Sequence, residues 1–215
     1  MKGLLLKDWY QVRTSMKAMY LTVAFVLVIW VFSTSSAYVF PVSYVAIFLG
    51  ILPVNLLSYD HASGWTEYSF ALPLSKELQV AEKYLVGLLC TAVSAALNGI
   101  FCGILFWMGK PLPAMPIGLL LGAGAASILL INGIMLPLYY RFGAEKARML
   151  YMLMFAGMGA ALGGGAVMDE LQQNGPGSGP LPVPLWLAAV LLLAVLALYA
   201  VSWRVSVAWY GKYKK

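Results

Sequence analysis

The sequence predicts an all-α fold: a polytopic membrane helix bundle with six transmembrane helices, preceded by an amphipathic helix. Composition is the first reason, because 62% of the 215 residues are hydrophobic, only 10% are charged and the mean hydropathy is +0.83. These values lie far from those of soluble globular proteins. The second reason is that the apolar residues fall into six runs, each near the length that crosses about 30 Å of hydrocarbon.

The first 18 residues are predicted to form an amphipathic helix in the headgroup region of the bilayer. Its apolar face follows helical spacing: Leu5, Trp9, Val12 and Met16. Lys7, Gln11 and Thr14 fall on another face, and the lysines are expected to point toward anionic lipid. No cleavable signal peptide is expected in this polar-striped segment. Residues 19–215 are predicted to be a single six-span transmembrane domain.

The six spans are predicted over residues 19–37, 42–57, 84–108, 117–138, 149–167 and 185–203. Short turns join the first and second spans and the third and fourth spans, and residues 168–184 form an outer loop rich in Gly, Pro and Asn between the fifth and sixth spans. Two longer polar connections, 58–84 and 139–148, lie on the other side of the membrane. The connections are too short to hold a second core, so one domain is expected.

The distribution of positive charge predicts the orientation. Of the 14 Lys and Arg residues, all except Lys110 lie in the N-terminal segment, the two longer connections and the tail after residue 203. By the positive-inside rule this side is cytosolic, so both termini are predicted to be cytosolic. The net charge of +6 thus follows the sides of the membrane and does not indicate a nucleic-acid partner.

Residues 58–84 are the longest polar interruption, and we expect two short helices with a bend between them. Asp60 or Ser63 can cap the first helix, on which Trp65, Tyr68 and Leu72 share one face. A simple interfacial hairpin would also fit this pattern. The length of segment 58–84 argues against that alternative, because connections in helix bundles need only about 2–8 residues.

Pro73 is expected to end the first of these helices, because it disfavours helical geometry at Leu72. Ser75 can cap the second helix, and Glu77 then lies in its first turn, where the helix dipole favours an anion. The second helix is expected to run through Lys83 into the third span.

The residues of this connection resemble a known pattern. It consists of an acid, Gly-Trp, Leu-Pro-small-Ser-basic, Val and Lys-Tyr-Leu, here Asp60, Gly64-Trp65, Tyr68, Ala71-Leu72-Pro73-Leu74-Ser75-Lys76, Val80 and Lys83-Tyr84-Leu85. The pattern is similar to that of the permease subunits of ATP-binding-cassette transporters of the type-2 exporter class, in their small six-span form. It covers about 30 residues. His61 departs from the family pattern, in which an acid is common there.

The resemblance implies that the connection is a cytosolic coupling helix that docks on a separate cassette ATPase. The residues that would carry the coupling are Asp60, Gly64, Trp65, Glu67, Tyr68, Leu72, Pro73, Ser75, Lys76, Lys83 and Tyr84. A permease homodimer, or a heterodimer with a homologous permease, is implied in a bacterial cytoplasmic membrane. ATP and Mg²⁺ would bind the ATPase, so no cofactor is expected in this chain.

The sequence argues against other classes of transporter and against an enzyme. No Asp, Glu, Lys, Arg or His falls inside a predicted span, whereas ion-driven carriers usually place ionisable groups at membrane depth. His61 is the single histidine, so we expect neither a catalytic serine–histidine pair nor a multi-histidine metal site. The glycine-rich run 122–127 lacks the lysine that a phosphate-binding loop needs.

Small and amide residues recur inside the predicted spans. Pairs of glycines at helical spacing predict helix packing, within the chain or across a dimer, with a pathway lining as the minor alternative: Gly99 and Gly103, Gly118 and Gly122, Gly159 and Gly163. Asn98 and Asn132 are expected to hydrogen-bond to neighbouring helices, with contact to substrate as the minor alternative. Cys90 and Cys102 lie too far apart on one predicted helix to form a disulfide with each other.

Two functions remain from this reading. The first is the membrane half of an ATP-driven exporter, whose cargo in this class is a peptide, an antibiotic or a lipid. An uncharged interior suits an amphipathic or apolar cargo. The second is an accessory membrane protein without transport activity, such as an immunity or assembly factor. The pattern over Gly64–Tyr84 distinguishes them, because an accessory protein has no need of an ATPase contact.

Overall fold

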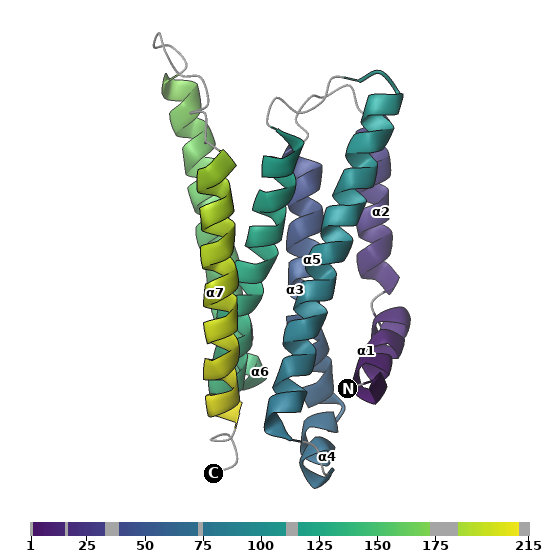
Figure 1. Cartoon of the computed structure of the whole chain (residues 1–215), viewed down its shortest axis with the longest axis vertical. Helices are drawn as coiled ribbons and strands as arrows, with labels where there is room; N and C mark the ends of the chain where they lie inside the picture. The colour runs from purple at the N-terminus through teal and green to yellow at the C-terminus, as the bar shows by residue number, and fades with distance from the viewer. Residues whose placement is uncertain are drawn as a thin grey trace.

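The computed structural model describes residues 2–15, 17–32, 39–72, 75–110, 116–172 and 185–210. The helices are α1 (Lys2–Ser15), α2 (Lys17–Phe32), α3 (Val39–Ala62), α4 (Trp65–Ala71), α5 (Lys76–Trp107), α6 (Ile117–Gln172) and α7 (Leu185–Tyr210). The long helices run side by side along the long axis of the molecule (Figure 1). The all-α prediction is confirmed for these residues.

Helix α3 lies inside the bundle, where it packs against α5 and α6. Helix α7 packs along α6, and α1 and α2 follow one another along the side formed by α3 and α5 (Figure 1). The short helix α4, helix α1 and the last turn of α7 lie at the same end of the molecule (Figure 1). We call this end the α4 end.

Four helices in the described residues are long and apolar enough to cross a membrane: Pro41–Ala62, Lys76–Trp107, Ile117–Gly143 and Ala189–Tyr210. The first predicted span is represented by Tyr20–Phe32, which is apolar but shorter. The fifth predicted span lies in the later part of α6, where the side chains of 154–172 are outside the described residues. The transmembrane helices are thus supported, while the number six stays a prediction.

The connection predicted over residues 139–148 is a tight reversal with almost no loop. Two helical parts of α6 meet at Gly143, where the helical geometry is broken, with φ 81° and ψ 177°. A positive φ is easily adopted only by glycine, so this one residue lets the chain reverse its direction. The later part of α6 then returns alongside α7 (Figure 1).

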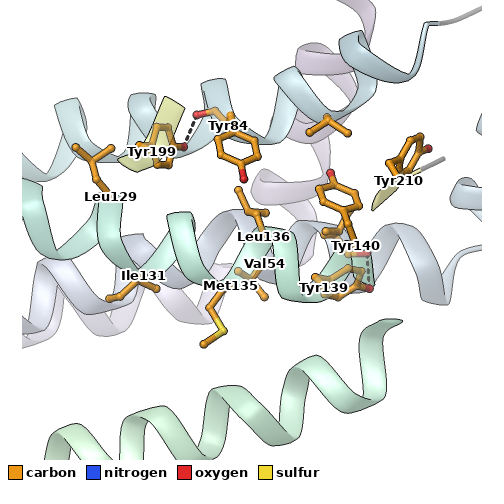
Figure 2. Packing of buried hydrophobic residues seen from close by; sticks show 12 residues of the cluster. Val54, Tyr84, Leu129, Ile131, Met135, Leu136, Tyr139, Tyr140, Tyr199 and Tyr210 are labelled. Carbon is orange, nitrogen blue, oxygen red and sulfur yellow. Dashed lines mark hydrogen bonds between the residues drawn. The ribbon is translucent and has the colours of Figure 1, made fainter. Parts of the chain in front are cut away.

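Tyrosines join α5, α6 and α7 in the core, which is drawn in Figure 2. The Tyr84 hydroxyl lies 2.7 Å from the hydroxyls of both Ser202 and Ser206. Tyr199 donates a hydrogen bond of 2.8 Å to the backbone oxygen of Tyr84. Ser202 in turn donates to the backbone oxygen of Gly133, at 2.5 Å. The hydroxyl groups of Tyr84, Tyr199, Ser202 and Ser206 are thus paired, which limits the cost of burying them.

Gly87 is the glycine that close helix packing requires. A β-carbon there would collide with the hydroxyl oxygen of Tyr199, which reaches past Gly87 to the α5 backbone. The predicted glycine seams behave differently, because a β-carbon at any of four of their residues would meet no atom of the described residues within 4 Å: Gly99, Gly103, Gly118 and Gly122. These four glycines make no close contact with the described part of the chain, and their packing across a dimer stays a prediction. Gly159 and Gly163 lie in the part of α6 whose surroundings are not described.

The two buried amides bond within their own helices, so the predicted bonds to neighbouring helices are also wrong. Asn98 donates to Ser94 Oγ at 3.3 Å, and Asn132 donates to the backbone oxygen of Ile128 at 3.0 Å. In each case the partner is four residues earlier, the spacing at which side chains of one helix meet the preceding turn. Cys90 and Cys102 are buried free thiols.

Candidate functional site

Residues 63–75, which we call the α4 connector, join α3 to α5 at the α4 end. Gly64 precedes α4 with φ 72° and ψ 6°, and no side chain caps this helix. The predicted caps are wrong: Asp60 belongs to α3, and the Ser63 hydroxyl bonds to the backbone oxygen of Asp60. Their side chains find other partners because α3 continues to Ala62 and reaches past the predicted end of the second span.

The far side of the α4 connector agrees with the local predictions. Leu72 leaves α4 in an extended conformation, with φ −82° and ψ 147°, as expected for a residue before proline. Pro73 itself lies outside the described residues. Ser75 caps α5 by accepting a hydrogen bond of 3.3 Å from the backbone N–H of Leu78, and Glu77 lies in the first turn.

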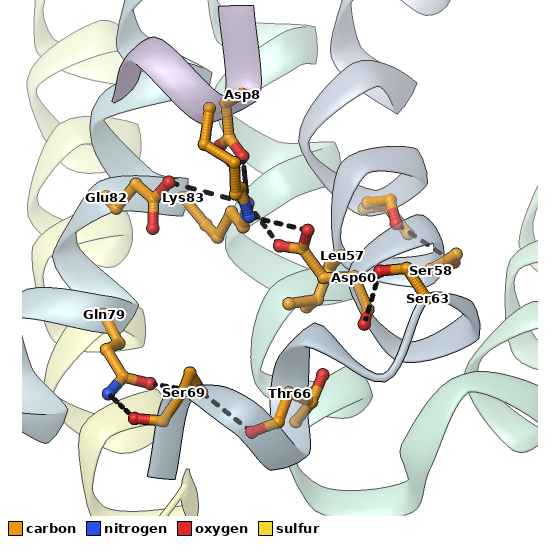
Figure 3. A network of polar contacts seen from close by, with 12 residues as sticks. Asp8, Leu57, Ser58, Asp60, Ser63, Thr66, Ser69, Gln79, Glu82 and Lys83 are labelled. Atoms are coloured by element: carbon orange, nitrogen blue, oxygen red, sulfur yellow. Dashed lines mark hydrogen bonds and ion pairs between the residues drawn. The ribbon is translucent and has the colours of Figure 1, made fainter. Parts of the chain in front are cut away.

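Two polar contacts hold α4 against the bundle (Figure 3). Ser69 Oγ lies 3.1 Å from Gln79 Oε1, and Gln79 Nε2 donates to the backbone oxygen of Ser69 at 3.3 Å. The hydroxyl of Tyr210, at the end of α7, also donates to Gln79 Oε1. Gln79 therefore ties together α4, α5 and α7, a role that sequence reasoning missed.

Lys83 in α5 is the centre of a buried ion cluster (Figure 3). Its Nζ lies 2.7 Å from Asp8 Oδ2 and 2.8 Å from Asp60 Oδ2. Asp8 belongs to α1 and Asp60 to α3, so one ammonium group binds three helices together. None of the three side chains is more than 5% exposed.

Lys7 and Glu82 complete the cluster. Lys7 Nζ lies 2.6 Å from Asp60 and 3.1 Å from Asp8, and it stands 4.7 Å above the ring of Trp65. The prediction that Lys7 points toward lipid is therefore wrong. Glu82 lies 3.8 Å from Lys83, and its Oε1 accepts no hydrogen bond from the described residues. We call Lys7, Asp8, Asp60, Glu82 and Lys83 the ion cluster.

The ion cluster holds three carboxyl groups and two ammonium groups. Charges removed from water cost several kcal/mol each, and only close pairing offsets that cost. Such a cluster adds little to stability compared with apolar residues of the same size, but removal of one member leaves the others unpaired. The relative positions of α1, α3 and α5 at the α4 end are therefore constrained, because a helix that moved away would leave a buried charge unpaired.

A small cavity of about 60 Å³ lies between the α4 connector and the ion cluster. Asp60, Glu82 and Lys83 line it together with Trp65 of α4 and Gly143 of α6. The reversal of α6 therefore meets the α4 connector at the same place as the ion cluster. The sequence had placed residues 58–84 and 139–148 on one side of the membrane without predicting this contact.

The structure divides the predicted coupling residues into three groups. Five are exposed: Gly64, Glu67, Tyr68, Ser75 and Lys76. Trp65 and Leu72 are half-buried, and Asp60, Lys83 and Tyr84 are buried. The exposed group, with its neighbours His61 and Glu77, gives the α4 end a polar surface that includes the Tyr68 ring. The buried group belongs to the ion cluster and to the tyrosine core.

Sequence reasoning missed Asp8, although a signal was present. Asp8 follows Leu5 by three residues and precedes Val12 by four, so it stands within the apolar face of α1. A carboxylate at such a position needs a buried cation, because an unpaired charge there is expensive. Among the residues that the structure describes, no group of three or more His, Cys, Asp or Glu could hold a metal ion.

Comparison with known families gives one match, which covers nearly the whole chain. Residues 3–211 match the model of the ABC-2 family transporter protein. Neither the curated proteins nor the solved structures contain a significant match. The match includes the four candidate membrane helices, the α4 connector and all five residues of the ion cluster. The chain therefore belongs to the ABC-2 family of transporter proteins, as a membrane permease that associates with an ATPase component.

Proposed function

We propose that this permease belongs to an exporter and that the α4 connector is the element through which the ATPase drives it. The supporting observation is the linkage of the connector to the bundle. Trp65 of α4 touches Lys7, and Lys7 shares the ion cluster with Asp60 at the end of α3 and Lys83 near the start of α5. A displacement of α4 therefore acts on three helices at once.

The exposed side of the connector supplies a surface for the partner. Glu67, Tyr68, Lys76 and Glu77 present both signs of charge and an aromatic ring to solvent at the α4 end. Aromatic anchors surrounded by polar groups are typical of protein interfaces. ATP and Mg²⁺ would bind the ATPase, and this chain would contribute no catalytic residue.

Transport would follow from a change in population between two arrangements of the bundle. ATP binding would bring two ATPase subunits together, move the connectors and favour the outward-open arrangement. Rigid transmission requires that the connector does not slide on the bundle. The bonds from Gln79 to Ser69 and Tyr210 oppose such sliding.

Two permease copies, or one copy and a homologue, would enclose the translocation path. A β-carbon at Gly99, Gly103, Gly118 or Gly122 would meet no atom of the described residues within 4 Å, which supports close packing of these glycines with a second permease. The cargo would be an amphipathic peptide, an antibiotic or a lipid. The apolar interior supports this choice, because α5 carries no charged residue after Lys83.

Two substitutions in α4 test this proposal. We expect Glu67→Arg and Trp65→Ala to leave the permease folded in the membrane but to weaken recovery of the ATPase. Losses at interface anchors are roughly 2–4 kcal/mol. The measurement is co-purification of the ATPase from the native membrane, compared with Ser127→Ala, a substitution of an exposed hydroxyl that bonds only within α6.

Unchanged recovery of the ATPase with both α4 variants would refute the coupling role. If no ATPase is recovered with the unaltered chain either, the accessory-protein function gains support. Because Trp65 also contacts Lys7, Glu67→Arg is the sharper of the two variants: Glu67 is exposed and lies outside the ion cluster.

A further inference from the structure

A second cavity lies beside the ion cluster, in the apolar part of the bundle. It has a volume of about 580 Å³ and is bounded by α1, α2, α3 and α5. Cavities of this size fall within the range of small-molecule binding sites. The coupling function proposed above does not use it, so it calls for an occupant of its own.

The walls of the cavity are almost wholly apolar. Leu5 and Val12 come from α1, Leu27 from α2, Leu52 from α3 and Val86 from α5. Among the described residues that line the cavity, Asp8 is the one that carries a charge, and its carboxylate is held by Lys83 and Lys7. A cavity with such walls offers nothing to a water molecule, which needs two to four polar partners. An occupant of this cavity would therefore be a hydrocarbon.

The cavity is open on the side of the lipid. Five of its lining side chains are themselves exposed: Trp9, Tyr20, Ala24, Leu89 and Val93. Leu89 and Val93 lie on α5, well inside a helix that is long and apolar enough to span the membrane. An acyl chain can therefore enter from the bilayer without passing through water.

Positive charge stands where the headgroup of such a lipid would lie. Arg13 is in the last turn of α1, and Lys17 begins α2. Both are exposed, and the Tyr20 hydroxyl bonds to the backbone oxygen of Arg13, which places Arg13 beside the cavity wall. Asp8, which is paired with Lys7 and Lys83, is the only acidic residue in the first 59 residues of the sequence. The charge therefore favours an anionic headgroup.

We propose that the cavity between α1, α2, α3 and α5 is a binding site for an anionic phospholipid, with one acyl chain in the cavity and the headgroup at Arg13 and Lys17. Such a lipid would fill space that the side chains of the bundle leave empty. It would also connect the state of the surrounding membrane to α1, which carries Lys7 and Asp8 of the ion cluster.

The experiment uses the full chain in vesicles of phosphatidylcholine with a minor share of phosphatidylglycerol. The probes are phosphatidylglycerol and phosphatidylcholine that carry the same photoreactive group in the acyl chain, and adducts are located by peptide mass spectrometry. For the unaltered chain we expect phosphatidylglycerol adducts to concentrate on the lining residues of α2 and α5.

Two variants separate the cavity from the charge. Ala24→Phe fills the mouth of the cavity, and we expect the adducts there to fall several-fold, while Ala92→Phe on an exposed, non-lining position of α5 leaves them unchanged. Arg13→Gln with Lys17→Gln should reduce the preference for phosphatidylglycerol by roughly fivefold per cation removed. Lys76→Gln with Lys146→Gln removes two exposed cations elsewhere and is the matched control.

Several results would overturn the proposal. Adducts spread evenly around the bundle, or equal labelling by the two lipids, would exclude a site for an anionic phospholipid. Protection of the cavity together with cross-links between two copies would assign it to a protein interface. Unchanged labelling in Ala24→Phe would show that the acyl chain lies elsewhere. None of these outcomes depends on ATPase binding, so the coupling function is tested separately.

Discussion

At Lys83, one ammonium group meets carboxylates from α1 and α3. We predict that Lys83→Met lowers the stability of the chain by about 3–5 kcal/mol, because Asp8 and Asp60 lose a cation that they cannot replace with water. The measurement is thermal unfolding in detergent, with Lys76→Met as the control at an exposed lysine of the same helix.

Neutral amides in place of Asp8 and Asp60 should restore part of the stability that Lys83→Met removes. Combining Lys83→Met with Asp8→Asn and Asp60→Asn removes the unpaired charge, so the triple variant is expected to melt above Lys83→Met alone. Equal melting temperatures for Lys83→Met and the Lys76→Met control would show that the buried ion pairs do not hold the helices together.

Gly87 allows a second residue-level prediction. Gly87→Ala should destabilise the bundle by roughly 1–3 kcal/mol, since the new methyl group collides with the Tyr199 hydroxyl and displaces it from the Tyr84 backbone. Gly99→Ala on the same helix meets no atom within 4 Å and is the matched control. A thermal-shift assay decides: two identical curves would contradict the close approach of α5 and α7.

The α4 connector gives the prediction at the scale of an element. Leu72 is extended, and proline fixes its own φ, so the bend between α4 and α5 has a restricted angle. Replacing Leu72-Pro73-Leu74 by three glycines should preserve ATPase binding but uncouple ATP hydrolysis from transport, because glycine lets the bend absorb the motion.

Proteoliposomes with the cognate ATPase measure both activities of this variant together. ATP turnover is expected to continue while cargo export falls. Export at the level of the unaltered chain would remove the connector as the transmitting element. Loss of ATPase binding itself would instead mean that the bend also shapes the docking surface, which the Glu67→Arg variant reports separately.

The sequence predicted the parts of the connector that depend on neighbouring residues. The Ser75 cap and the extended Leu72 follow from side chains within three residues of the site, so local rules suffice. The caps proposed for α4 failed because Asp60 is used by Lys7 and Lys83, which lie far away in the sequence. Local rules cannot weigh a contact of this kind.

The limit of local rules also explains which features of the whole bundle the sequence predicted and which it did not. Apolar runs predicted α3, α5, α6 and α7, since burial in a membrane leaves a strong mark on composition. The break predicted at 139–148 is present but is confined to Gly143, because charged residues such as Arg141 and Lys146 fit a helix end as well as a loop. The spacing of the glycine pairs did not predict close helix contacts among the described residues. The close contact between α5 and α7 is made at Gly87, which belongs to none of those pairs.

Topology is the prediction for the whole molecule. With both termini and the α4 connector in the cytosol, a cysteine at Ser63 should react with a membrane-impermeant thiol reagent from the cytosolic side, and one at Gly177 from the outside. The background carries serine in place of Cys90 and Cys102, which are both buried. Labelling of Gly177→Cys from the cytosolic side alone would refute the six-span arrangement.

The ion cluster also sets an order for biogenesis. Asp8 is synthesised 75 residues before Lys83, and Lys7 is synthesised 53 residues before Asp60. At about 5–20 residues per second, Asp8 waits several seconds for its counter-ion during translation. Helix α1 therefore cannot complete its ion pairs until α3 and the start of α5 have been synthesised. The first helix to leave the ribosome depends on later helices for its buried partners.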